Sequence, residues 1–175
     1  MRKIFQKFWA WYERHYAVNV GLAAFLFALQ LFHLYWLTAH VVAHRILGIF
    51  LFEPSKLFEL IIILVDYTEI PTLIGVSLIY LNNLRKRFDS KSLLYLIFLN
   101  LQWLHIFWIT DEFVVRRFIG TGAGTVFPVW LTWIAILIDY LELPVIYDTA
   151  RRFIAILKER GPLASLGAFK EKQLL

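Results

Sequence analysis

Residues 29–48 read LQLFHLYWLTAHVVAHRILG, and residues 101–120 read LQWLHIFWITDEFVVRRFIG. A second motif, Asp-Tyr-x-Glu-x-Pro, begins at Asp66 and again at Asp139, an offset of 73. We therefore interpret the chain as two copies of one segment pair, in which ionisable residues recur inside very apolar surroundings. The first pair of stretches, at an offset of 72, shares Leu29, Gln30, His33, Trp36, Thr38, Val42, Arg45 and Gly48 with Leu101, Gln102, His105, Trp108, Thr110, Val114, Arg117 and Gly120.

The composition is that of a membrane protein. Of 175 residues 60% are hydrophobic, and the chain has 16 Phe, 8 Tyr and 7 Trp. A bilayer core of about 30 Å requires roughly 20 apolar residues per helix, and four stretches meet this requirement, at about 17–47, 57–82, 91–115 and 125–147. Apolar residues run three or four in a row rather than alternating, which argues against a membrane β-barrel. The sequence predicts an all-α integral membrane protein with a bundle of four transmembrane helices.

The two copies predict two helical hairpins, at 17–83 and 84–150. Both begin on the same side of the membrane, so the repeats are parallel and related by an axis along the membrane normal. Before them, residues 1–16 carry apolar and aromatic side chains at helical spacing with basic residues on the other face. This pattern predicts an interfacial amphipathic helix, although a charged lead-in to the first span explains it as well. Residues 151–175 form a predicted cytoplasmic tail.

Charge predicts the orientation. Lys and Arg gather before the first span, between the second and third spans and after the fourth. By the positive-inside rule both termini are cytoplasmic, and we expect a multi-pass protein of the inner cell membrane. The net charge of +5 is then an attraction to anionic lipid headgroups of the bilayer, not to nucleic acid. Because the chain has no Cys, a metal ion would have to bind through nitrogen and oxygen.

The ionisable residues of the four spans fall in pairs that share a helix face. In the first and third spans the members of a pair are seven residues apart, and in the second and fourth they are three apart. Six of the residues lie roughly 13–22 Å below the outer helix ends, and His40 and Glu112 lie one layer nearer the outside. The predicted metal ligands are His33, His40, Asp66, Glu69, His105, Glu112, Asp139 and Glu142.

The negative charge of carboxylates clustered inside a bilayer has to be removed by protonation or balanced by cations. A single buried acid costs at least ~2.5 kcal/mol, so the acids are either protonated or neutralised by cations. Two divalent ions suit this number of carboxylates, and neutral histidine beside them favours Fe, Zn or Mn. Asp66 and Asp139 are either ligands or acceptors that orient the histidines. Because His40 is matched by Glu112, the two predicted ion positions are not equivalent.

This arrangement resembles the ferritin-like di-iron and di-manganese four-helix bundles, in which Glu and His project inward from four helices. The resemblance implies a membrane four-helix bundle with a dimetal-carboxylate site. The motif differs: those bundles carry Glu-x-x-His on one helix, whereas here Asp-x-x-Glu starts at Asp66 and at Asp139 and the histidines stand on the other two helices.

The remaining polar residues suggest supporting roles. Gln30 and Gln102 are predicted to form hydrogen bonds between helices. Pro71 and Pro144, each two residues after a glutamate, predict a kink within the second and fourth spans. For Tyr67 and Tyr140 we expect a structural role, with donation to the acids or participation in redox chemistry as the alternatives.

Three functions are compatible with these residues. The first is an intramembrane dinuclear metal-binding protein, with redox activity on a lipophilic small molecule such as a quinone or a lipid. The second is a proton or metal-ion transporter, which with four helices per chain would call for a homo-oligomer. The third is a structural metal staple without turnover. Patterns typical of NTPases, acyl hydrolases and His-Glu-x-x-His zinc proteases are absent from the sequence.

Overall fold

The computed structural model describes residues 2–49, 51, 55–111 and 128–160. Every regular element in these ranges is helical, as predicted. The elements are α1 (Arg2–Arg14), α2 (Tyr16–Trp36), the π-helix η1 (Leu37–Val42), α3 (Ala43–Leu47), α4 (Lys56–Tyr67), α5 (Glu69–Lys86), α6 (Ser90–Trp108), α8 (Val129–Tyr140) and α9 (Leu143–Arg160).

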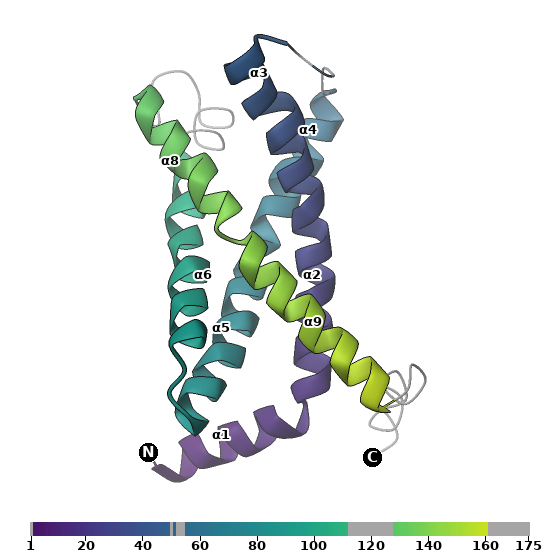
Figure 1. The fold of residues 1–175 in the computed structure, drawn as a ribbon, viewed down its shortest axis with the longest axis vertical. Coiled ribbons are helices and arrows are strands. Elements are labelled where there is room, and N and C mark those ends of the chain that lie inside the picture. The colour runs from purple at the N-terminus through teal and green to yellow at the C-terminus, as the bar shows by residue number, and fades with distance from the viewer. Residues whose placement is uncertain (1, 50, 52–54, 112–127, 161–175) are drawn as a thin grey trace.

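Four helical stretches are long and apolar enough to cross a membrane: Tyr16–Leu47, Leu60–Lys86, Ser90–Asp111 and Trp130–Glu159. They correspond to the four predicted spans. The fourth continues past the apolar stretch that ends at about 147, because α9 is helical as far as Arg160, directly before Gly161 and Pro162. Helix α9 crosses α2, and its last turns project beyond the other described helices (Figure 1).

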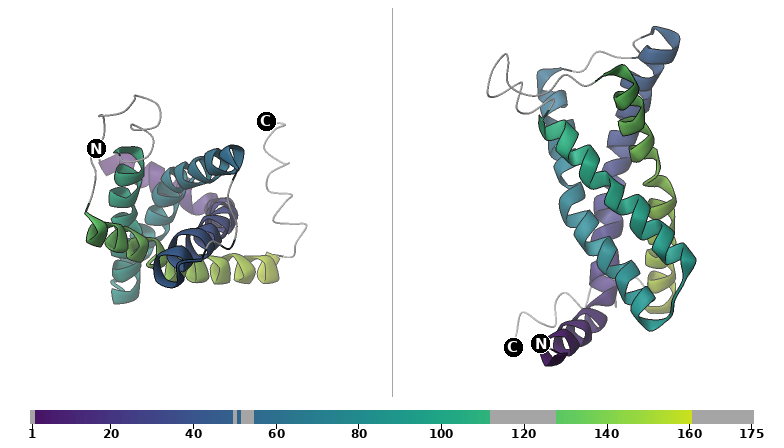
Figure 2. Two further views of the ribbon diagram at one scale, coloured as in Figure 1. Left: turned by 90° about the horizontal axis from the view of Figure 1, so that it is seen from above. Right: turned by 90° about the vertical axis from the view of Figure 1, so that its left-hand side faces the viewer.

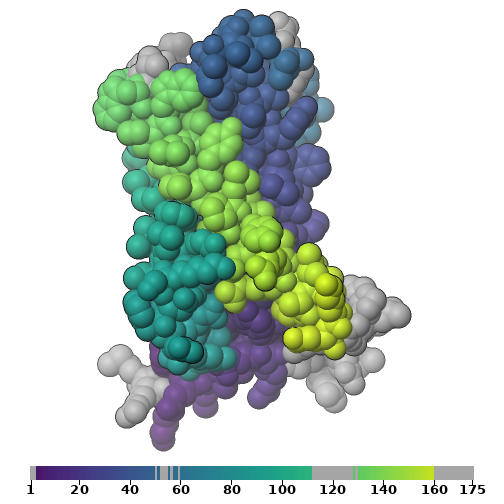
Figure 3. Space-filling view, viewed as in Figure 1, coloured from purple at the N-terminus to yellow at the C-terminus, as the bar shows by residue number. Residues whose placement is uncertain are grey.

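The four stretches form one elongated bundle (Figures 1 and 2). The helix from α2 through η1 to α3 runs along its whole length, α4 and α5 return beside it, α6 rises again, and α8 and α9 descend across one face (Figure 1). Of the described helices, α4, α5 and α9 contact α2, while α5, α8 and α9 contact α6. The space-filling view shows α8 and α9 covering the face between α6 and α2 (Figure 3). This packing encloses an interior lined by all four spans.

The second and fourth spans are broken in the middle rather than simply kinked. A turn at Thr68 separates α4 from α5, and a turn at Leu141 and Glu142 separates α8 from α9. Each proline therefore stands in the first turn of a new helix, where its missing N–H has no partner to lose. Two helix starts are thereby placed inside the bundle, each beginning at or just after a glutamate.

Polar side chains gather in the interior of the bundle, and large apolar side chains cover its outer surface. The interior holds fully buried Gln, His, Asp and Glu side chains, whereas soluble proteins almost never bury Asp and Glu completely unless they are paired. The outer surface of the spans exposes large apolar side chains, including Phe25, Phe32, Tyr35, Leu64 and Phe107. Such a surface suits contact with lipid.

Helix α1 lies across the end of the bundle where α5 and α9 finish (Figure 1). Its Trp9 and Tyr12 are buried, while Ile4, Phe5 and Trp11 are exposed, so only part of its apolar surface packs on the bundle. Glu13 at its end accepts from Arg85 at 2.5 Å and pairs with Lys86 at 3.0 Å. The hydrogen bond from Lys86 holds the pKa of Glu13 below its usual value.

The turn between α5 and α6 is closed by a helix cap. Asp89 accepts from the backbone N–H of Ser92 at 3.0 Å and from its hydroxyl at 2.7 Å. These hydrogen bonds lower the pKa of Asp89. The cap fixes the start of α6 at Ser90. The start of the helix determines which side chains face the interior, and His105 is one of them.

Candidate metal centre

Two histidine–aspartate pairs lie at the centre of the bundle. His33 on α2 contacts Asp66 on α4 through Nδ1 and Oδ1, and His105 on α6 contacts Asp139 on α8 through Nδ1 and Oδ1 at 2.9 Å. The offsets of 72 and 73 at which the sequence motifs recur also relate these two contacts. All four side chains are buried, with exposed fractions of 3% for His33, 5% for Asp66, 6% for His105 and 2% for Asp139.

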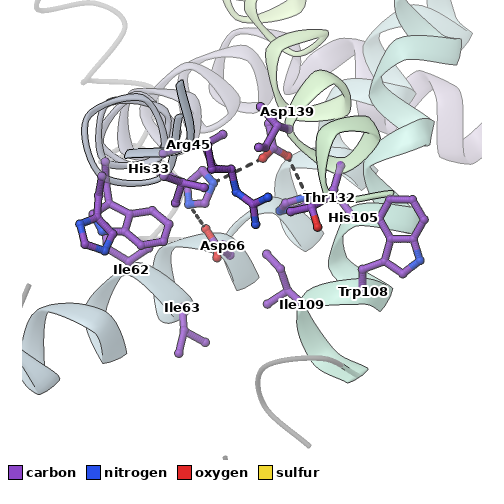
Figure 4. A pocket seen from close by; sticks show the side chains of 16 residues that line it. His33, Arg45, Ile62, Ile63, Asp66, His105, Trp108, Ile109, Thr132 and Asp139 are labelled. Carbon is purple, nitrogen blue, oxygen red and sulfur yellow. Dashed lines mark ion pairs between the residues drawn. The ribbon is translucent and has the colours of Figure 1, made fainter. Parts of the chain in front are cut away.

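The two pairs are joined by Asp139. Its second oxygen, Oδ2, lies 3.7 Å from Nε2 of His33, so this carboxylate faces both imidazoles (Figure 4). The rings of His33 and His105 stand edge to face, with centroids 6.0 Å apart. One ligand atom from each of His33, His105 and Asp139 lies within 4.8 Å of the others. That spacing allows one metal ion to contact all three.

The imidazole nitrogens that do not face an aspartate at close range have no hydrogen-bond partner among the described residues. Nε2 of His105 is buried without one, and Nε2 of His33 has only the distant Asp139 oxygen. A buried polar atom left without a partner costs about 1–3 kcal/mol. A histidine that gives one nitrogen to a carboxylate and the other to a metal is the usual arrangement at metal sites. The donor set of imidazole nitrogen and carboxylate oxygen fits Fe, Zn or Mn.

The predicted hydrogen bonds of the two glutamines between helices are confirmed, and they hold the helix breaks in place. Gln30 on α2 donates through Nε2 to the Val65 carbonyl at 2.9 Å and to the Thr68 hydroxyl at 3.2 Å. Gln102 on α6 donates to the Ile138 carbonyl at 2.9 Å. Both carbonyls belong to the last turn before a break, where the helix supplies fewer donors of its own. The glutamines therefore fix the ends of α4 and α8, which carry the aspartates.

The tyrosines of the two motifs do not donate to the acids; that alternative was wrong. Thr38 and Thr110 each donate their hydroxyl proton to a carbonyl one turn earlier in their own helix. Tyr140 is therefore the donor to Thr38 at 2.6 Å, and Tyr67 is the donor to Thr110 at 2.8 Å. Each hydrogen bond links one sequence copy to the other, so the expected structural role of the tyrosines is confirmed.

Above the cluster the first helical stretch changes from α-helix to π-helix at Leu37–Val42. This change was not predicted from the sequence. A π-helical turn also includes Ile109, Thr110 and Asp111 at the end of the third span. Thr38 and Thr110 lie in these turns, and their hydroxyls bond back to the main chain. Such local widening is frequent at functional sites.

Of the other predicted ligands, Glu69 and Glu142 lie at the helix breaks, 2% and 1% exposed. Oε2 of Glu69 and Oε1 of Glu142 have no hydrogen-bond partner among the described residues. They do not belong to the three-residue group whose ligand atoms converge within 4.8 Å. His40 lies in the π-helix, stacked on Trp36 with ring centroids 5.7 Å apart, and outside that group. Glu112 falls outside the described residues.

A cavity of about 370 Å³ opens above the cluster (Figure 4). His33, His105, Asp66 and Asp139 form its polar floor, while its walls are mainly tryptophan and aliphatic side chains, with His40 and Thr132 among them. Arg45 also lines it. Sequence reasoning assigned no role at the site to Arg45, although its match with Arg117 in the other copy was visible. The cluster is thus reached through an apolar chamber.

Comparisons of the chain with protein-family models, with curated proteins and with solved structures found no match. What this site does is therefore inferred from its own side chains.

Proposed function

We propose that this protein is an integral membrane metalloprotein that binds two divalent transition-metal ions inside a bundle of four spanning helices built from two parallel repeats. The observation that carries the proposal is the convergence of His33, His105 and Asp139, buried at the floor of an apolar cavity. The apolar outer surface and the four long helices support insertion into the bilayer. Contacts repeated at offsets of 72 and 73 support the two repeats.

The first ion would be held by Nε2 of His33, by His105 and by Asp139. Asp66 orients His33 through Nδ1, as carboxylates do for metal-bound histidines. In the absence of a metal this arrangement would leave imidazole nitrogens buried without partners. Metal binding removes that cost.

The second ion would be held by Glu69 and Glu142. Both carboxyls are buried beside the breaks and carry oxygens without partners. Discontinuous membrane helices recur at ion and substrate sites, because their free helix starts and unwound backbone supply polar groups in the middle of the bilayer. Two divalent ions would also balance the four charges of Asp66, Asp139, Glu69 and Glu142.

The reaction that we propose for this centre is a metal-dependent oxidation or reduction of a lipophilic small molecule. The apolar cavity that leads to the polar floor supports this proposal, since a purely structural metal would need no chamber. When bound, the metal would supply the redox chemistry. The residues of the chain hold the metal, orient its ligands and exclude water from the site.

The test is elemental analysis of protein purified in detergent without added metal. We expect about two tightly bound transition-metal ions per chain, and loss of metal in His33→Ala and in His105→Ala. His44→Ala is the matched control, because His44 is an exposed histidine that does not belong to the converging group. Fewer than about one ion per chain, or full metal content in both site variants, would refute the proposal. A content of zinc alone would leave the metal site standing and remove the redox part.

A further inference from the structure

The cavity above the metal centre combines mainly apolar walls with one arginine. Its walls include Trp36, Ile62, Trp108 and Ile136. Among the described residues that line it, Arg45 is the only Lys or Arg. The chamber is therefore suited to a molecule with a long apolar part and one negative charge.

Arg45 stands at the end of the cavity away from the floor. It belongs to α3, twelve residues after His33, which corresponds to about 18 Å of helix. Its guanidinium reaches into the chamber (Figure 4), and it makes no ion pair with any residue that the structure describes. A guanidinium with free donors is well suited to a carboxylate head group, which it can bind through two parallel hydrogen bonds.

We infer that this cavity binds a single-chain lipophilic carboxylate, with the head group on Arg45 and the end of the chain facing the His33–His105 cluster. The inference rests on the proposed function for the metal at the floor, and it names the class of the lipophilic substrate. In that arrangement the metal would face carbon atoms of the chain rather than the carboxylate.

The volume selects a chain of moderate length. A water molecule occupies about 30 Å³ of liquid, so a cavity of about 370 Å³ holds on the order of 12 non-hydrogen atoms. Decanoate has this size. A phospholipid with two acyl chains is too large, and a longer fatty acid would extend beyond the cavity.

Charge decides which end of the molecule points inward. Arg45 attracts the carboxylate at one end of the cavity, whereas at the floor Asp66 and Asp139 leave no net positive charge to attract it even when the proposed ions are bound. Helix α3 also lies at the end of the bundle (Figure 1), where a charged group would remain near the polar surface of a bilayer. The apolar chain is then the part that enters the core.

The two wall tryptophans provide a direct probe. Trp36 and Trp108 each lie one helical turn after the histidine of their own span. Bromine quenches indole fluorescence at short range, so 10-bromodecanoate added to the protein in nanodiscs should quench these residues saturably. The Trp36→Phe/Trp108→Phe double variant should lose the saturable quenching. Unchanged quenching in that variant would overturn the inference, because the molecule would then bind elsewhere.

The head-group assignment is tested with Arg45→Gln. Loss of a charge-assisted hydrogen bond should weaken 10-bromodecanoate binding about tenfold or more. Arg87→Gln, a change at an exposed arginine at the other end of the bundle, should leave the affinity unchanged. Wild-type protein should bind 10-bromodecanol at least about tenfold more weakly than the carboxylate. Equal affinity for alcohol and carboxylate, or no effect of Arg45→Gln, would overturn the inference.

Metal content, measured on the same preparations, reports separately on the proposed function. If the purified protein contains no metal but its quenching still depends on Arg45, the carboxylate site is supported and the metal proposal is refuted. Metal-loaded protein whose quenching does not depend on Arg45 would overturn the carboxylate site alone.

Discussion

Replacing Asp139 by Asn should weaken metal binding more than it disturbs the fold. Asn has nearly the same shape as Asp, so the packing around this buried residue is kept. Its amide cannot supply the negative charge that Asp139 presents to His105 at 2.9 Å and to His33 at 3.7 Å. Removing a group that orients a metal ligand typically lowers metal affinity by about 10–100-fold, and Asp139 is also positioned to be a ligand itself.

This loss can be expressed as stability. A metal present at 100 times its Kd stabilises the native state by about 2.7 kcal/mol. If Asp139→Asn weakens binding about 100-fold, the same metal concentration equals the new Kd, and the stabilisation falls to about 0.4 kcal/mol. For a chain of this length each kcal/mol moves Tm by roughly 2–4 °C. The part of the metal-induced rise in Tm that comes from the ion at His33, His105 and Asp139 should therefore fall from roughly 5–11 °C to about 1–2 °C.

The measurement is thermal unfolding of wild type and variant in the same nanodiscs, with metal removed by chelation and then restored. Asp89→Asn is the matched control, because Asp89 is an exposed carboxylate that caps α6 and Asn caps helices equally well. The control should show the full wild-type rise in Tm. If Asp139→Asn shows it as well, Asp139 is neither a ligand nor an orienting group and the assigned centre is wrong.

Three further predictions concern the parts around the centre. Gln30→Leu and Gln102→Leu should each destabilise the bundle by about 0.5–2 kcal/mol in unfolding experiments, because each removes the hydrogen bond that a glutamine donates to a carbonyl of another helix, Val65 or Ile138; no change in either variant would contradict this role. Tyr67→Phe and Tyr140→Phe should each cost about 0.6 kcal/mol, and clearly unequal costs would argue against equivalent contacts between the two copies. Because the pKa of Glu13 is lowered in the folded protein, the attachment of α1 should be strong above the ordinary value of 4.5 and weaken as the pH falls below it; Trp9 fluorescence should follow this change in wild type and not in Glu13→Gln.

The sequence was sufficient to predict the four helices and the convergence of their histidines and aspartates. Both follow from periodicity: an offset shared by His33 and His105, and another shared by Asp66 and Asp139, place equivalent residues at equivalent heights. The assignment of Glu69 and Glu142 as ligands stays a prediction, since both carboxyl groups are buried but do not belong to the group of converging ligand atoms. The second and fourth helical stretches were predicted to be kinked but continuous, whereas the structure has a turn at Thr68 and another at Leu141 and Glu142.

The breaks and the π-helix were not predictable because each depends on partners from another helix. Proline excludes an interior helix position but leaves open whether the helix bends or stops. Here the helices stop, and Gln30 and Gln102 donate from neighbouring helices to carbonyls beside the two stops. The π-helix places Thr38 opposite Tyr140, a contact between residues about a hundred positions apart that no local pattern encodes.

The charge of the cluster limits how many ions it holds. Four buried carboxylates and two imidazoles leave two net negative charges even if both imidazoles are protonated, and in the proposed membrane bundle each uncompensated charge would cost at least ~2.5 kcal/mol. Two divalent ions with neutral imidazoles reach zero net charge, and the same neutral imidazoles are the form that binds metal. One divalent ion also reaches zero if Glu69 and Glu142 each keep a proton. The two arrangements differ in their response to Glu69→Gln: the first loses an ion, whereas the second keeps its single ion, so elemental analysis of this variant distinguishes a dinuclear centre from a mononuclear one.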